Sequence, residues 1–388
     1  MVLFLSVREM KFELGTRERE IRSFVSEFAT AEVLPRAAEI DRKGKFPMDI
    51  VKRMGEHKLF GIPFPAEYGG LGDNLMCYVL AVEELSKVSA SIGFLCCAAL
   101  ISLFPIYFAG SEEQKHRYME PLCSGEKLGA FAVTEPAAGS DPLSMETAAV
   151  REGDEYILNG RKAFITNAAV ADIYVVFAYT DKSKGRRGIS AFIVEKGTEG
   201  FSFSRLVEMT GMRGCVVGGL EFHDCRVPAA NRLGDEGDGF RIAMATLDRD
   251  RIVMGSIGVG IARACVEASK RYARERKQFE QPIANFQAVQ FMIADMAMRA
   301  EAARLLTYKA AYLADSGERI TEAASMAKLY ASETAFQAAT SAAQIHGGLG
   351  CTRGSLVERL LRDARILSIA VGTSEIQRVV IAREELRQ

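Results

Sequence analysis

The stretch QIHGGLGCTRGSLVERLLRDARILSIAVGTSEIQRVVIAREEL, residues 344–386, decides how this chain is classified. It contains a glycine-rich turn (Gly347, Gly348 and Gly350) followed by a helical pattern with arginines on one face. A second turn, at residues 372–374, precedes another helical pattern. Glycine turns in front of helices leave backbone N–H groups free for an anionic or polar ligand. The segment therefore predicts two places where a ligand approaches the backbone.

The composition is that of an ordinary globular protein. The chain has 388 residues and a net charge of −1, so it is long enough for two or three domains with substantial cores. A near-zero charge gives no electrostatic footprint for nucleic acid. The eight cysteines include no CxxC pair, and we expect reduced thiols that mostly pack as small apolar residues. The four histidines have no metal-ligand spacing, so no metal site is expected.

Two apolar runs bear on localisation. Residues 2–5 are too short for the core of a signal peptide. Residues 92–109 are almost free of polar side chains and long enough to suggest a membrane span. We interpret them instead as a buried helix interrupted at Ser102 and Pro105. We therefore expect a cytoplasmic protein without a membrane anchor.

The pattern of apolar residues divides the chain into three parts. Helical spacing runs to about residue 125, short β-branched and aromatic segments separated by turns follow, and long Ala-rich helical stretches return from Phe240. We predict an α+β multidomain protein. Its expected parts are an N-terminal all-α domain (1–125), a middle antiparallel, β-barrel-like domain (126–235) and a C-terminal four-helix bundle (236–388).

Three further motifs carry chemistry: TEPAAGSD (134–141), FITN (164–167) and RKQF (276–279). Taken alone, TEPAAGSD is typical of a capped turn, FITN of a strand end with an aromatic residue in the core, and RKQF of a basic segment exposed to solvent. Together with the C-terminal segment and in this order, they make the chain resemble the FAD-dependent acyl-CoA dehydrogenases over nearly its whole length. The helical, β, helical order of the domains matches that family, and the resemblance implies Met10 as an alternative start.

The resemblance implies an FAD site. In the family the TEPAAGSD loop lies along the flavin, an aromatic residue covers the ring, and an arginine from the neighbouring subunit reaches the FAD phosphates. Phe164 replaces the usual tryptophan but keeps an aromatic face, and Arg276 is a fork-shaped donor suited to a diphosphate. The residues expected at FAD are Phe131, Val133, Thr134, Ser140, Phe164, Thr166, Arg276, Gln278, Phe279, Gln287, Gln344, Ile345, Gly347, Gly348, Thr373 and Glu375.

The same resemblance implies partners. A shared FAD site implies at least a homodimer, and the family is typically a homotetramer. The expected substrate is an acyl thioester, of CoA or of acyl carrier protein. An electron-transfer flavoprotein is the expected acceptor. We expect neither nucleic acid nor a membrane as a partner.

One position departs from the family pattern. Family members commonly place a catalytic Glu before the Gly-Thr turn, and this chain has Val371, which keeps only the backbone N–H that would hold the thioester oxygen. A branch of the family carries its Glu on a helix just before an Arg, and here Asp250 precedes Arg251. We predict Asp250 as the catalytic base. The residues expected at the substrate are Ser140, Asp248, Arg251, Val371 and Gly372.

Alternatives remain open at this position. The run DRDR (248–251) is also typical of a solvated ion-pair patch, in which Asp250 has no catalytic role. Asp is one methylene shorter than Glu, and a misplacement of about 1 Å costs about 10²-fold in rate. A shorter base suits a different acyl shape, a carrier-bound thioester or unusual regiochemistry. Two further functions are compatible with the sequence: a flavin monooxygenase or oxidase that shares the fold, and a non-catalytic flavoprotein.

Other chemistries lack their motifs. The HGG at residues 346–348 is also found in esterase oxyanion turns, but the chain has no GxSxG pentapeptide to supply the nucleophile. It has no Walker motif, and GSIGVG (255–260) has the wrong spacing for a dinucleotide turn. We interpret His346 as structural.

Overall fold

The N-terminal part of the chain is helical. The computed structural model describes residues 13–387, so the prediction about Met10 lies outside the described residues. Capping fixes several helix starts: Asn74 accepts from the N–H of Cys77, and Ser111 and Gln114 form a capping box. The helices are α1 (Thr16–Phe28) with a π-helical turn (Ala29–Val33), α2 (Ala37–Lys43), α3 (Met48–Glu56), α4 (Leu75–Val88), α5 (Ala90–Ala109) and α6 (Glu112–Cys123).

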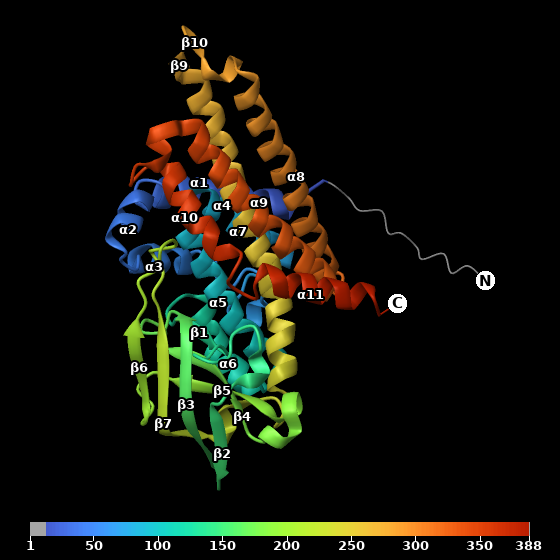
Figure 1. Ribbon diagram of the computed structural model, residues 1–388. Coiled ribbons are helices and arrows are strands. Elements are labelled where there is room, and N and C mark those ends of the chain that lie inside the picture. The colour runs from blue at the N-terminus through green and yellow to red at the C-terminus, as the bar shows by residue number, and fades with distance from the viewer. Residues whose placement is uncertain (1–12, 388) are drawn as a thin grey trace, which may run out of the picture.

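A twisted sheet forms the middle domain, which lies at the lower end of the molecule in Figure 1. Its strands are β1 (Gly129–Ala132), β2 (Ala148–Glu152), β3 (Glu155–Thr166), β4 (Ile173–Tyr179), β5 (Ile189–Glu195), β6 (Phe201–Leu206), β7 (Val217–Pro228) and β8 (Arg232–Leu233). The strand order is β6-β7-β3-β2-β4-β5-β8, with β1 added beside β4. The pairing is antiparallel as predicted, except that β4 runs parallel to both β1 and β2.

Long helices form the C-terminal bundle and extend away from the sheet (Figure 1). Its elements are α7 (Gly239–Glu275), the hairpin β9 (Lys277–Gln278) and β10 (Gln281–Pro282), α8 (Gln287–Asp315), α9 (Thr321–His346), α10 (Leu356–Leu367) and α11 (Ser374–Glu385). Glycines bring α7 close to its neighbours. A Cβ on Gly258 would lie 2.7 Å from the Ala331 carbonyl oxygen, and one on Gly260 would lie 2.6 Å from that of Glu83. The GSIGVG run therefore serves helix packing.

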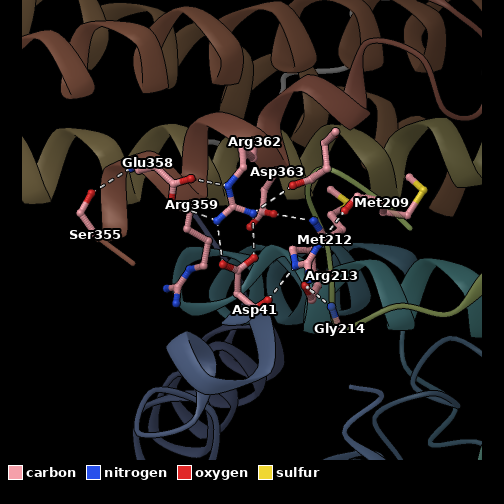
Figure 2. Close-up of polar contacts among 12 residues, drawn as sticks. Asp41, Met209, Met212, Arg213, Gly214, Ser355, Glu358, Arg359, Arg362 and Asp363 are labelled. Atoms are coloured by element: carbon pink, nitrogen blue, oxygen red, sulfur yellow. Dashed lines mark hydrogen bonds and ion pairs between the residues drawn. The ribbon is translucent and has the colours of Figure 1, made fainter. Parts of the chain in front are cut away.

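A polar cluster joins the three domains (Figure 2). Arg362 of α10 donates to both carboxylate oxygens of Asp41 in α2, at 2.9 and 2.7 Å. Its neighbour Asp363 accepts from the backbone N–H of Met212, in the loop after β6, at 2.5 Å. Burial raises the pKa of Asp363 to about 6. Arg362, and Arg359, which donates to the Val88 carbonyl oxygen, therefore bind other parts of the protein, whereas Arg365 of the same helix is exposed.

Two sequence expectations about helix ends are wrong. Helix α5 continues without interruption through Ser102 and Pro105, because both residues are buried and the packing of the helix outweighs the one hydrogen bond that Pro105 cannot donate. Helix α10 does not begin at the glycine turn. It begins at Leu356, where Ser355 accepts from the N–H of Glu358, and the glycines form a separate 3-10 turn (Gly347–Cys351). The second predicted start is confirmed: Thr373 caps α11.

Two of the described helices, α5 and α7, are long and apolar enough to cross a membrane. Their apolar windows are 72% and 83% buried inside the protein, which is the behaviour of core helices.

Candidate active site

A bulge in β3 turns Phe164 out of the sheet. The pairing of β3 with β7 shifts register between Lys162 and Ile165, and Phe164 has a left-handed φ of 55°. Its side chain is 66% exposed, although it is a large aromatic. Bulges next to functional sites often re-aim a side chain, and a left-handed bulky residue stores strain of about 1–3 kcal/mol. The backbone therefore holds an aromatic face open for a ligand.

A buried ion pair holds the TEPAAGSD loop beside Phe164. Lys162 donates to Glu135 at 2.7 Å and to the Val133 carbonyl oxygen at 3.2 Å, and Glu135 also accepts from the backbone N–H groups of Glu146 and Thr147. Burial lowers the pKa of Lys162 to about 8, against the opposing effect of Glu135. The N–H of Ala163 donates to the Thr134 carbonyl oxygen. Thr134 and Phe164 are thus brought together.

Other predicted cofactor residues on this edge are partly open. Phe131 in β1, Val133 and Thr166 are half-buried, and Ser140 is exposed. Asp141 caps the following turn by accepting from the N–H of Leu143, as the sequence predicted. A Cβ added at Gly139 would meet nothing within 4 Å, so the backbone of this loop is accessible.

A second group of predicted cofactor residues lies at the far tip of the bundle. Arg276, Gln278 and Phe279 belong to the β9–β10 hairpin and Gln287 begins α8; all are exposed, Phe279 to 86%. The rise of α7 separates Arg276 from Asp250 by about 39 Å. The β9–β10 hairpin and β3, which carries Phe164, lie at opposite ends of the molecule (Figure 1), so the structure does not bring this group to the Phe164 edge within one chain.

The end of α9 lies near that tip. His346 stacks on Tyr272 of α7, with ring centroids 4.3 Å apart, and its Nδ1 lies 2.7 Å from the Ala342 carbonyl oxygen. A structural role for His346 agrees with these contacts. Gln344, Gly347 and Gly348 are exposed, Ile345 is buried, and Cβ atoms added at the two glycines would meet nothing within 4 Å.

In the turn between α10 and α11, side chains bind the carbonyl oxygens of Val371 and Gly372. Val371 has a φ of 57°, a strained conformation for a β-branched residue. The carbonyl oxygens of Val371 and Gly372 accept from Gln377, at 3.2 and 2.9 Å, and Lys328 donates to the Gly372 oxygen. No acceptor for the Val371 N–H occurs among residues 13–387. The turn thus offers a free backbone donor, flanked by Thr373 and the exposed Glu375.

Asp250 lies in the interior, where α5 packs against α7. It is fully buried, and the thiol of Cys97 is 2.8 Å from its Oδ1. Its Oδ2 has no hydrogen-bond partner within the described part of the chain. Burial raises the pKa of Asp250 to about 7, although Cys97 and Arg251 act to lower it. Asp250 is therefore no member of a solvated ion-pair patch.

Asp248 and Arg251 face another way. Arg251 donates to Oδ1 of Asp248 at 2.7 Å. Thr321, the first residue of α9, donates to Oδ2 of the same aspartate at 2.7 Å. Burial lowers the pKa of Arg251, and its charge in turn contributes to a lowered pKa at Lys328. This places the α7 segment that carries Asp250 close to the lysine that holds the Gly372 turn.

Several residues of this region were not predicted. Lys162 and Lys328 occupy core-facing positions of β3 and α9, and a lysine at such a position is a signal that sequence alone offers. Glu135 lies inside a motif already singled out. Cys97 gave no signal, because its partner lies 153 residues away.

Three models of the acyl-CoA dehydrogenase family match consecutive parts of the chain. The N-terminal domain matches residues 16–126, the middle domain residues 130–225 and the C-terminal domain residues 237–386. The chain therefore belongs to the acyl-CoA dehydrogenase family, whose members are flavoprotein oxidoreductases, and the fold class predicted from sequence is confirmed.

Relatives and solved structures agree with this placement. The chain is 47% identical to a short-chain specific acyl-CoA dehydrogenase of Clostridium acetobutylicum, over 97% of this chain and 100% of the relative. It is 45% identical to CarC of Acetobacterium woodii, a subunit of a caffeyl-CoA reductase–Etf complex, over 93% and 95%. The structure of butyryl-CoA dehydrogenase from Megasphaera elsdenii superimposes with a TM-score of 0.96, at 41% identity over 97% and 100%. The prolyl acyl carrier protein oxidase AnaB superimposes with a TM-score of 0.93, at 36% identity over 96% and 99%.

Proposed function

We propose that this enzyme is an FAD-dependent dehydrogenase of short acyl-CoA thioesters in which Asp250 is the catalytic base. The observation that carries the assignment is the state of the Asp250 carboxylate. It is fully buried, only a thiol binds it, and one oxygen is unpartnered within the described residues. A general base works best when its pKa lies near the operating pH, and burial brings that of Asp250 to about 7.

The exposed features fit a flavin dinucleotide. Phe164 presents an open aromatic face, and the accessible backbone at Gly139 suits the approach of the flavin ring. Gly347 and Gly348 lie near the far tip, where their accessible backbone would approach the phosphate groups of a neighbouring subunit's flavin. Bound FAD would supply the acceptor for the hydride that leaves the substrate β-carbon. Thr134, Ser140 and Thr166 would line the Phe164 edge.

The protein supplies two groups to the thioester. Asp250 would take the α-proton as a carboxylate. The free N–H of Val371 would donate to the thioester oxygen as negative charge develops there, a contribution that donors fixed in advance make effectively. Lys328 and Gln377 hold the opposite side of the turn and so keep this donor in place. Asp248, Arg251 and Gly372 would shape the surrounding substrate site.

The relatives support the substrate class and the acceptor. Two of them are named for short acyl-CoA substrates, and one belongs to a complex with Etf. We infer a cytoplasmic enzyme that passes electrons to an electron-transfer flavoprotein. The likeness to a carrier-protein oxidase supports a carrier-bound thioester as the second candidate.

A second copy of the chain completes the flavin site in this proposal. Arg276, Gln278, Phe279 and Gln287 lie at the end of the bundle opposite the sheet that carries Phe164 (Figure 1), and Arg276 is about 39 Å along α7 from Asp250. They would therefore reach the flavin of a neighbouring subunit. A stripe of exposed apolar side chains on α8, spaced by seven residues, offers the contact: Phe291, Met298, Leu305 and Tyr312.

The test is anaerobic flavin reduction by saturated thioesters of CoA and of carrier protein. Asp250→Asn should keep its flavin but lose about 10²–10⁴-fold in the rate of flavin reduction. Asp363→Asn is the matched control, because Asp363 is also buried with a raised pKa but lies in the domain junction. Asp250→Asn reducing its flavin as fast as the control would refute the base, and no reduction of the wild type by any thioester would refute the substrate class.

A further inference from the structure

The Asp250 carboxylate has one bonded and one free oxygen. The Sγ atom of Cys97 lies 2.8 Å from Oδ1, whereas Oδ2 has no partner among the described residues. Both side chains are almost completely buried. Burial raises the pKa of Cys97 well above its usual range, so the sulfur carries its proton and acts as the donor. The contact is therefore an S–H···O hydrogen bond to a carboxylate.

Titratable groups from several elements lie around Asp250. Tyr78 approaches from α4 and donates its hydroxyl to the Cys96 carbonyl oxygen. Cys96 and Cys97 approach from α5, and Cys215 lies beyond Cys97. Arg251 follows Asp250 on α7 but donates to Asp248, and Lys328 of α9 lies beside Arg251. None of these other groups hydrogen-bonds to Asp250 within residues 13–387.

A thiol is a suitable partner for a base. It is a weak donor, so it fixes the direction of a carboxylate while reducing its basicity less than a hydroxyl, amide or cation would. An aspartate is one methylene shorter than the glutamate it replaces, and small errors in its aim are costly in rate. A donor that fixes one oxygen leaves the other pointing in a single direction.

We propose that Cys97 is a positioning residue for the base, its thiol holding Oδ1 of Asp250 so that Oδ2 is the oxygen that receives the substrate proton. The proposal rests on the assignment of Asp250 as the base. In the step it describes, an O–H bond forms at Oδ2 as the α C–H bond breaks. The electron pair of that bond remains on the substrate and forms the new C=C bond, and bound FAD would accept the hydride that leaves the β-carbon.

The first test is the pH dependence of flavin reduction in single-turnover experiments with butyryl-CoA. Replacing the thiol with an apolar group removes a bond that favours the carboxylate. In the plot of the rate constant against pH, the midpoint of the acidic limb should therefore lie about one pH unit higher in Cys97→Ala and Cys97→Val than in the wild type. These two variants should also lower the plateau of the rate constant by about tenfold, with little change in KM. Cys97→Ser keeps a donor, and a stronger one, so it should bring the limb back to the wild-type position or below it and restore most of the plateau.

The matched control is Cys96→Ala. Cys96 is buried on the same helix and takes part through its backbone carbonyl, which the substitution keeps. A purely structural role for Cys97 would change stability in the Ala and Val variants and leave the acidic limb where it is in wild type and Cys96→Ala. That result would overturn the proposal.

A second readout needs no turnover. The S–H stretching band of Cys97, identified as the band that Cys97→Ser removes, should shift to lower frequency as Asp250 ionises between pH 5 and 9. The shift should be absent in Asp250→Asn. A band that does not respond to pH in the wild-type enzyme would overturn the hydrogen bond.

The two assignments fail in different ways. If Asp250→Asn loses flavin reduction while Cys97→Ala keeps the wild-type pH profile, the base stands and the role of Cys97 is refuted. If Asp250→Asn reduces its flavin normally, the base is refuted and the role of Cys97 with it.

Discussion

Lys328 of α9 donates a hydrogen bond to the carbonyl oxygen of Gly372, with 2.7 Å between the two atoms. Gln377 reaches the same oxygen from α11 at 2.9 Å. Lys328 is fully buried and makes no ion pair within the described residues. Two side chains from different helices thus determine the conformation of a turn that contains two successive residues with left-handed φ. This arrangement explains how Val371 keeps a strained backbone at the turn that we propose faces the substrate.

Replacing Lys328 with methionine should change how stability depends on pH. Burial lowers the pKa of Lys328 from 10.5 to about 7 in the folded protein. Between those values the unfolded chain binds one more proton, so this group makes the free energy of unfolding rise with pH. In Lys328→Met that slope should fall by up to about 1.4 kcal/mol per pH unit in this window. Urea denaturation at several pH values measures the slope.

The control for this change is Lys309→Met, because Lys309 is an exposed lysine on α8. In Lys309→Met, the slope of the free energy of unfolding against pH should equal that of the wild type. A Lys328→Met slope equal to that of the wild type would mean that Lys328 is protonated in the folded enzyme.

Moving the carboxylate from α7 to the turn should restore activity. In an Asp250→Ala background, Val371→Glu places a carboxylate at the position most of the family uses. It also removes a β-branched residue from a left-handed conformation. We expect flavin reduction at least about tenfold faster than in Asp250→Ala alone, since a general base contributes about 10²–10⁴-fold. Val371→Gln in the same background is the matched control. Equal rates in the Glu and Gln variants would show that the turn does not face the α-proton.

The sequence predicted the elements, and two of the residues that meet at the Phe164 edge, because both depend on local patterns. Turn residues, β-branched runs and Ala-rich helical spacing identified the three domains, and Phe164 and Thr134 came from contiguous motifs. The helix start placed at the glycine turn was wrong because Ser355, a stronger cap, lies five residues after Gly350.

The pairings that shape the site could not be predicted from sequence. Cys97 with Asp250, and Lys328 with Gly372, join residues far apart in the chain, and their meeting depends on how α5, α7 and α9 pack. The parallel pairing of β1 with β4 was missed for the same reason.

Breaking the Lys162–Glu135 pair should destabilise the TEPAAGSD loop (134–141). Lys162→Met leaves a buried carboxylate without its cation, a change that costs about 3–5 kcal/mol. Because Glu135 also binds the N–H groups of Glu146 and Thr147, its protonation or displacement should reach Thr134 and Ser140. We expect a lower melting temperature and reduced flavin content in the purified protein, measured by absorbance.

Lys184→Met is the control for this change. Lys184 pairs with Asp181 at the surface, where such pairs contribute little. If Lys162→Met retained flavin and stability to the same extent as Lys184→Met, the buried pair would have no part in holding the loop.

Introducing negative charges into the exposed apolar stripe on α8 should separate the subunits, and the separated subunits should lose their flavin. Met298 and Leu305 lie two turns apart on the face that carries Phe291 and Tyr312, and Met298→Glu with Leu305→Glu places like charges on both surfaces of a symmetric contact. We expect a lower mass by sedimentation velocity and a lower flavin content, because the hairpin of Arg276 would no longer reach a neighbouring flavin. Val150→Glu, at an exposed apolar position on β2, should change neither. Unchanged mass in the double variant would refute the contact, and monomers that keep a full complement of flavin would refute the shared site.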